Sequence, residues 1–161
     1  MTIRYDTAAP IAWPEIVLGG LLIALGDAAF ATTYWFSWDA AGVTRMFQSI
    51  AVGVLGKDSF DGGAGAAALG AGLHLVMATM FVAAYALVAR RKPALLDKPL
   101  VYGIPYGVLM YVIMNFIVMP LSRVGRAPSL EHPERLFPVV LAHLVFGVLC
   151  VLFARRALRR R

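Results

Sequence analysis

Hydrophobic residues in this chain gather in four long runs that are separated by short polar segments. The runs cover about residues 15–37, 65–89, 100–121 and 136–154. Each run is close to the ~20 residues that an α-helix needs to cross ~30 Å of hydrocarbon. Because the runs contain few charges and occupy most of the chain, they predict an all-α integral membrane protein. We expect a bundle of four transmembrane helices that forms a single domain over residues 1–161.

The longest connection, between the first two runs, predicts a short amphipathic helix over about residues 44–56. Apolar side chains recur there at helical spacing, whereas Gln48 and Ser49 fall on other faces of the helix. The apolar face consists of Met46, Phe47, Ile50, Ala51, Val54 and Leu55. We expect this helix, in the first extracytoplasmic loop, to lie at the outer membrane interface or to dip back toward the bundle.

Small residues recur at four-residue spacing in three of the runs, a pattern typical of closely packed membrane helices. Pro105 lies inside one of these patterns and predicts a bend in the third helix. The small residues are Gly20, Ala24 and Ala28 in the first run, Ala66 and Gly70 in the second, and Gly103 and Gly107 in the third.

Lysine and arginine residues are distributed unequally between the two sides that this topology defines. The two tails and the second loop carry ten of them, and the other two loops carry five. Cytoplasmic segments are richer in Lys and Arg, so both termini are expected in the cytoplasm. We also expect basic residues of the C-terminal tail to contact anionic lipid headgroups. These residues are Arg155, Arg156, Arg159 and Arg160.

The composition supports the membrane assignment and argues against a nucleic-acid partner. Hydrophobic residues make up 60% of the chain and charged residues 15%, whereas soluble domains contain about 25% charged residues. The net charge is +6, but the basic residues flank apolar runs and leave no free basic face for phosphates. The expected partner is therefore the lipid bilayer. The single cysteine, Cys150, cannot form an intramolecular disulfide.

Each hydrophobic run has one strongly polar residue well inside it. With a rise of ~1.5 Å per residue, all four lie roughly 9–15 Å beneath the outer surface. An ionisable side chain at that depth is costly unless it is paired, so we expect the four to converge. Imidazole N–H groups can donate to a carboxylate, and an amide can both donate and accept. The four are Asp27, His74, Asn115 and His143, with Gln48, Ser49 and Ser122 as candidates for additional polar contacts.

Three uses of such a cluster remain open. The first is a site for an ion, a proton or a small solute, as in transporters. The second is a haem or transition-metal site that has His74 and His143 as ligands on facing helices. The third is a polar lock that fixes helix register without chemistry. The sequence has no Ser-His-Asp order, HExxH motif or CxxC pair, so nothing in it indicates an enzyme.

Several short strings carry a resemblance to known proteins. They are Gly26-Asp27, Gln48-Ser49-Ile50-Ala51, Leu69-Gly70 with Leu73-His74, and Met114-Asn115 through Pro120-Leu121-Ser122, together with His143. In these strings the chain resembles a group of small bacterial inner-membrane proteins of the YagU-like kind, from the first run onward. The resemblance implies a bacterial inner-membrane location and a four-span core. It brings no assigned activity, cofactor or substrate.

The leading interpretation is a small inner-membrane protein that binds or moves an ion, metal or small solute at the intramembrane cluster, without a resident cofactor. Because one four-helix unit leaves little room for transport, this interpretation includes assembly into a homo-oligomer. The alternative is an accessory or structural subunit of a larger membrane complex, with the outer amphipathic helix and the small-residue faces as partner surfaces. A haem- or metal-binding redox protein is the third interpretation.

Overall fold

The computed structural model describes residues 10–129 and 131–159 and confirms the all-α fold. Within these residues, four segments are long and apolar enough to cross a membrane: α1 (Trp13–Trp35), α3 (Gly63–Arg91), Pro99–Leu121 and α6 (Pro133–Ala157). The third segment is made of α4 (Pro99–Val112), a π-helical turn η3 (Ile113–Val118) and the short α5 (Met119–Leu121). The other elements are α2 (Ala40–Leu55) and the 3₁₀ helices η1 (Gly56–Phe60) and η2 (Pro93–Leu96).

Proline marks the beginning of three of the four spanning segments. Pro14, Pro99 and Pro133 all lie in the first turn of their helices. The N–H that proline lacks has no partner at that position in any helix, so the residue costs little there. This explains why α6 begins before the expected start at about residue 136. Pro138 lies inside α6 without ending it.

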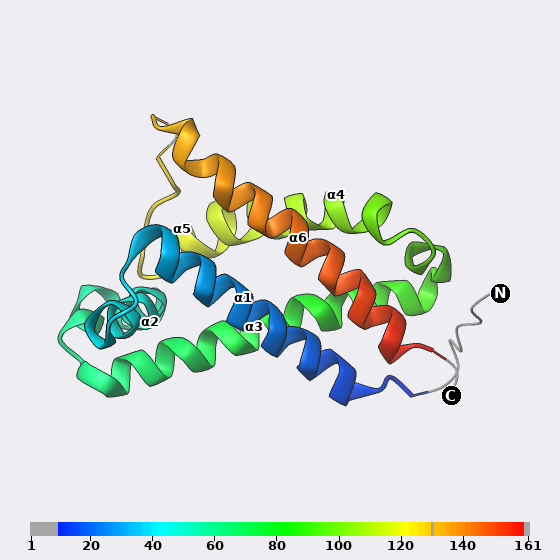
Figure 1. The fold of residues 1–161 in the computed structure, drawn as a ribbon, viewed down its shortest axis with the longest axis horizontal. Coiled ribbons are helices and arrows are strands. Elements are labelled where there is room, and N and C mark those ends of the chain that lie inside the picture. The colour runs from blue at the N-terminus through cyan, green and yellow to red at the C-terminus, as the bar shows by residue number, and fades with distance from the viewer. Residues whose placement is uncertain (1–9, 130, 160–161) are drawn as a thin grey trace.

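Helix α6 is the centre of the arrangement. It packs against α4, α1 and α3, and α1 also packs against α3 (Figure 1). The start of α1 and the end of α6 meet, because the Ala12 N–H donates to the Ala157 carbonyl at 3.1 Å. We call this the terminal end, and η2 lies there too. The opposite end, which holds α2, η1 and α5, is the α2 end.

Glycines allow the closest helix approaches. A Cβ added to Gly147 of α6 would overlap the Gly103 carbonyl and the Gly107 N–H of α4. A Cβ on Gly20 of α1 would overlap the side chain and backbone of Thr79 of α3. Close backbone approach increases the dispersion contacts that hold helices together in lipid. The small residues expected at positions 20, 103 and 107 therefore lie in helix contacts.

Helix α2 packs against α3. Its N-cap is Asp39, whose carboxylate accepts hydrogen bonds from the Gly42 N–H at 2.7 Å and the Ser37 hydroxyl at 3.0 Å. These two bonds hold the pKa of Asp39 below its ordinary value, and the bond from Gly42 contributes most. Gln48, expected outside the apolar face, is buried. Its Nε2 donates to the Gly63 carbonyl at 3.1 Å, so the buried amide has a hydrogen-bond partner.

Candidate functional site

Asp27 of α1 and His74 of α3 lie side by side. The His74 Nε2 is 3.5 Å from the Asp27 Oδ2 and 3.1 Å from the Ala24 carbonyl oxygen. The close contact of Gly20 with Thr79 produces this geometry, since α1 and α3 are antiparallel and the next turns of each helix must meet. The pair expected from depth in the membrane is therefore in place.

The surroundings of His74 fix the position of one proton. The Ala24 carbonyl can only accept a hydrogen bond, so the Nε2 of His74 carries a hydrogen and donates it. The same N–H faces the Asp27 carboxylate at 3.5 Å, which is longer than the 2.7–2.9 Å typical of a charge-assisted hydrogen bond. The interaction with Asp27 is thus mainly electrostatic, and the Nδ1 of His74 remains the only ring nitrogen with a lone pair.

His143 of α6 is the third member of this group. It is close enough to Asp27 for a direct electrostatic interaction, as is His74. Its Nδ1 lies 2.8 Å from the Val139 carbonyl of its own helix and so carries the hydrogen of the neutral ring. The Nε2 is then the nitrogen with the free lone pair. The ring meets Tyr111 edge-on at 5.5 Å and Phe146 at 6.0 Å between centroids.

Asn115 does not complete the expected network. Its Nδ2 donates to the Tyr111 carbonyl of its own helix at 3.0 Å. Asn115 lies in the π-helical turn η3, which precedes Pro120. A proline ring clashes with the carbonyl four residues earlier, and widening the preceding turn relieves this clash. The wider turn changes the pattern of backbone hydrogen bonds. The Asn115 side-chain amide supplies a donor to the Tyr111 carbonyl, at the end of α4.

The three additional polar candidates lie at the α2 end and bond to nearby backbone. Gln48 donates to Gly63 as described, and the Gln48 carbonyl accepts a hydrogen bond from the Ser59 hydroxyl at 2.9 Å. The Ser49 hydroxyl donates to the Met46 carbonyl at 2.6 Å. The Ser122 hydroxyl donates to the Met119 carbonyl at 2.9 Å. Gln48 thus links α2 to η1 and to the start of α3, whereas Ser49 and Ser122 bond within their own turns.

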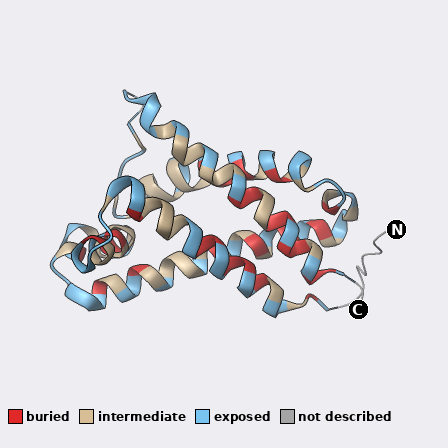
Figure 2. Cartoon of the chain, viewed as in Figure 1, coloured by how far each residue is buried: buried red, intermediate tan, exposed pale blue. Residues whose placement is uncertain are grey.

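Packing differs between the two halves of the molecule on either side of Asp27. Every buried residue of α6 lies between Phe146 and Ala157, toward the terminal end, and η3 and α5 bury none. In α1 the buried residues between Ile16 and Ala24 lie on the same side, and Thr32 alone lies on the other. Figure 2 shows this concentration of buried positions toward the terminal end. In α1 and α6 the polar group thus lies at the edge of the main buried cluster, while α2, η1 and the start of α3 bury a smaller set of residues at the other end.

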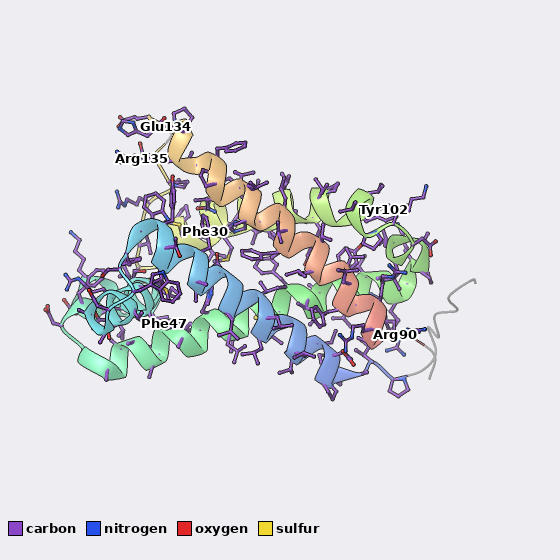
Figure 3. All side chains as sticks on the ribbon, in the orientation of Figure 1. Phe30, Phe47, Arg90, Tyr102, Glu134 and Arg135 are labelled. Atoms are coloured by element: carbon purple, nitrogen blue, oxygen red, sulfur yellow. The ribbon has the colours of Figure 1, made fainter. Side chains whose placement is uncertain are left out.

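The basic tail is partly engaged by the protein itself. The Arg156 Nε lies 2.9 Å from a carboxylate oxygen of Glu15, and its guanidinium stacks over Phe153 at 5.4 Å. Arg155 lies in the last turn of α6, Arg159 is exposed after it, and Arg160 lies outside the described residues. Figure 3 places Arg90 and Tyr102 at this same end, and Glu134 and Arg135 at the other.

Two contacts between distant elements are not evident from the sequence. The Tyr106 hydroxyl of α4 donates to the Phe81 carbonyl of α3 at 2.8 Å. The backbone and side chain of Arg123 bond to the end of α2. Neither contact belongs to a recognisable sequence motif, so only the three-dimensional structure reveals them.

The described residues contain no group of three or more His, Cys, Asp or Glu side chains that is placed to hold a metal ion. Comparison of the chain with protein-family models, curated proteins and solved structures found no match.

Proposed function

We propose that this chain is a small multi-pass membrane protein whose Asp27–His74 pair binds a cation, either a proton or a small cationic solute. His143 is the second imidazole of the site. The observation that carries the proposal is the 3.5 Å separation between His74 Nε2 and Asp27 Oδ2 inside two spanning helices. Intramembrane ionisable residues usually mark ion, proton or ligand pathways.

The exposure and the charge of the Asp27–His74 site both favour reversible binding of a cation. The Asp27 side chain retains 31% of its accessible surface and the His74 side chain 16%, so the protein does not fully enclose either group. With neutral imidazoles, an ionised Asp27 gives the site a net negative charge. Binding one cation removes that charge, and with it much of the cost of keeping a carboxylate in a low-dielectric environment.

We further propose that the protein resides in a bacterial inner membrane with both termini in the cytoplasm. The support is the excess of Lys and Arg on the side of the termini, together with the resemblance to small inner-membrane proteins. The α2 end then faces outward. Arg155 and Arg159 would contact anionic headgroups at the inner surface, while Arg156 pairs with Glu15.

The test is a titration of Asp27 in the full chain reconstituted in lipid. Infrared difference spectra across a pH series should show a carboxyl band that is missing in Asp27→Asn and retained in Asp97→Asn. Asp97 is an exposed acid in the connection before α4, so it controls for the loss of one carboxylate. Proteoliposomes that contain a pH-sensitive dye then test whether a membrane potential drives proton flux through the native chain and not through Asp27→Asn.

The alternatives give different results in the same preparations. If Asp27 keeps one protonation state across the series and Asp27→Asn changes neither binding nor flux, the cation site is wrong. A polar lock would then show as a loss of thermal stability in both Asp27→Asn and His74→Ala. An accessory subunit would show unchanged stability and co-purification with another membrane protein. A haem absorption band or stoichiometric metal that is lost in His74→Ala and His143→Ala would favour a redox protein.

A further inference from the structure

The imidazole of His143 is packed against two buried aromatic side chains. Tyr111 of α4 meets it edge-on at 5.5 Å between ring centroids, and Phe146 of its own helix lies at 6.0 Å. Neighbours of this size limit the rotamers that the imidazole can adopt. The 2.8 Å hydrogen bond from the His143 Nδ1 to the Val139 carbonyl requires one particular rotamer. The packed rings therefore protect this bond.

Tyr111 meets His143 because the backbones of α4 and α6 touch one turn away. A Cβ added to Gly107 of α4 would overlap the His143 carbonyl, so no side chain separates the two helices there. Tyr111 follows Gly107 by four residues and thus projects from the same side of α4. The position of its ring against the imidazole is therefore set by the contact between the two helices.

Asn115 holds the backbone of Tyr111 in place. Tyr111 lies in the last turn of α4, next to the π-helical turn Ile113–Val118. At such a junction the backbone hydrogen bonds change from a four-residue to a five-residue spacing. The Asn115 Nδ2 donates to the Tyr111 carbonyl at 3.0 Å, and the neighbouring Phe116 ring meets the Tyr111 ring edge-on at 6.1 Å. The π-helical turn thus contacts Tyr111 through both its carbonyl and its ring.

We infer that Tyr111 and Asn115 are positioning residues for His143. The Tyr111 ring holds the imidazole in the rotamer that bonds to Val139, and the Asn115 amide holds Tyr111. In this rotamer the Nδ1 carries the hydrogen, and the Nε2 keeps the lone pair that can accept a proton beside Asp27. The inference rests on the proposed cation site, and it explains how the second imidazole of that site keeps one tautomer.

His74 provides an internal reference in the same chain. Its hydrogen is fixed on Nε2 by the bond to the Ala24 carbonyl of α1. That bond joins α1 to α3 and does not involve α4 or the π-helical turn. Changes at Tyr111 or Asn115 should therefore alter the tautomer of His143 and leave that of His74 as it is.

The test is ¹⁵N NMR of the histidine-labelled full chain in lipid. At alkaline pH, the ¹⁵N shifts of a neutral imidazole show which of its two nitrogens carries the hydrogen. The signals of His143 are assigned by their loss in His143→Gln. Tyr111→Leu removes the ring and Tyr111→Phe keeps it. Tyr106→Leu is the matched control, because it removes a tyrosine ring from the same helix at a position that packs on Tyr85.

Tyr111→Leu should lower the ratio of the Nδ1–H form to the Nε2–H form of His143 about fivefold, the effect of losing one edge-on aromatic contact. Tyr111→Phe and Tyr106→Leu should both keep the native ratio. An unchanged ratio in Tyr111→Leu would overturn the inference. So would an equal change in Tyr106→Leu, which would mean that any loosening of α4 alters His143.

Asn115 is tested separately, which also covers the case that Tyr111→Leu does not fold. Asn115→Ala should lower the same ratio, because the Tyr111 carbonyl loses its side-chain donor. Asn115→Ser should restore the native ratio, since a serine hydroxyl in a helix can donate to the carbonyl four residues earlier. Native ratios in both variants, or equal losses in both, would contradict the role of Asn115.

The positioning role and the cation site can fail independently. The NMR experiment reports the imidazole tautomer whether or not Asp27 binds a cation. A native tautomer in Tyr111→Leu would therefore leave the cation site standing. An Asp27 carboxyl that never titrates in the infrared experiment would remove the cation site without altering the tautomer of His143.

Discussion

Replacing Gly147 with alanine tests whether backbone contact between α4 and α6 holds the bundle together. The added Cβ would overlap two backbone atoms of α4 and would lie 2.6 Å from the Gly107 Cα, whereas ordinary contact begins at 3.4 Å. Backbone cannot rotate out of the way as a side chain can. The other two atoms lie closer still, so the helices must separate locally by at least about 0.8 Å, the difference between these two distances.

The cost follows from the dispersion contacts across the interface. A gap of 0.5–1 Å forfeits about a quarter to a half of each contact, which is worth ~0.1–0.2 kcal/mol per atom pair. For roughly sixty pairs the loss is about 3 kcal/mol. Alanine recovers about 1 kcal/mol through its higher helix propensity. The net destabilisation is thus about 2 kcal/mol, within the range measured for overpacked cores.

The single cysteine provides the assay. Cys150 lies one turn beyond Gly147, is 0% exposed, and its Sγ is 3.9 Å from the Sδ of Met110 in α4. Its thiol can be labelled only when the α4–α6 contact opens, so the labelling rate follows the free energy of opening. At 1.4 kcal/mol per tenfold change, Gly147→Ala should be labelled about 30 times faster than the native chain.

Gly72→Ala is the matched control, because a Cβ on Gly72 meets no atom within 4 Å. It adds the same methyl group to a spanning helix and should leave Cys150 protected. Native labelling rates in Gly147→Ala would refute the reasoning, as would equal acceleration in Gly72→Ala. Circular dichroism must show native helix content in both variants for the rates to be compared.

Three further predictions concern the connections outside the glycine interface. Asp39→Ala should speed amide hydrogen exchange at the start of α2, and Asp39→Asn should not, because asparagine also caps helices. Since the folded pKa of Asp39 is lowered from 3.8, its stabilisation is present above pH 3.8 and is lost as the pH falls through the folded value. Glu15→Gln should cost at most about 1 kcal/mol in thermal unfolding, and added salt should remove most of the difference, because Arg156 is largely exposed. Tyr106→Phe should cost about 1 kcal/mol through loss of its bond to the Phe81 carbonyl, while Tyr102→Phe should be neutral in the same unfolding assay.

The architecture could be predicted because the thickness of the bilayer determines how long and how apolar a spanning helix must be. The amphipathic pattern also located α2, and it correctly buried Met46 and Ala51. It misplaced Gln48, since periodicity treats every polar side chain as solvent-facing. A buried amide is tolerated when a backbone carbonyl meets it, and the Gly63 carbonyl comes from the start of another helix. No pattern within α2 itself contains that information.

Depth in the membrane predicted the neighbours of Asp27 better than it predicted Asn115. Depth depends on the rise per residue, which changes little from helix to helix. The similar depths expected for Asp27 and His74 therefore agree with the contact between them. Convergence also depends on rotation about each helix axis. The π-helical turn at Ile113–Val118 has more residues per turn than an α-helix, so it changes the direction of the side chains around it. Pro120 follows this irregular turn and could have signalled it, whereas a bend was expected only at Pro105.

The geometry of the pair also bears on whether it is a lock. A lock must contribute energy to the contact that it fixes, and the His74 N–H does so by donating to the Ala24 carbonyl of α1. Its distance to the Asp27 carboxylate exceeds that of a strong hydrogen bond. The register of α1 against α3 is already set by Gly20 on Thr79, where backbone meets side chain with no space left. Gly20 packing and the His74–Ala24 bond thus account for the register without the Asp27 carboxylate, which leaves the proposed cation site as the role to test for Asp27.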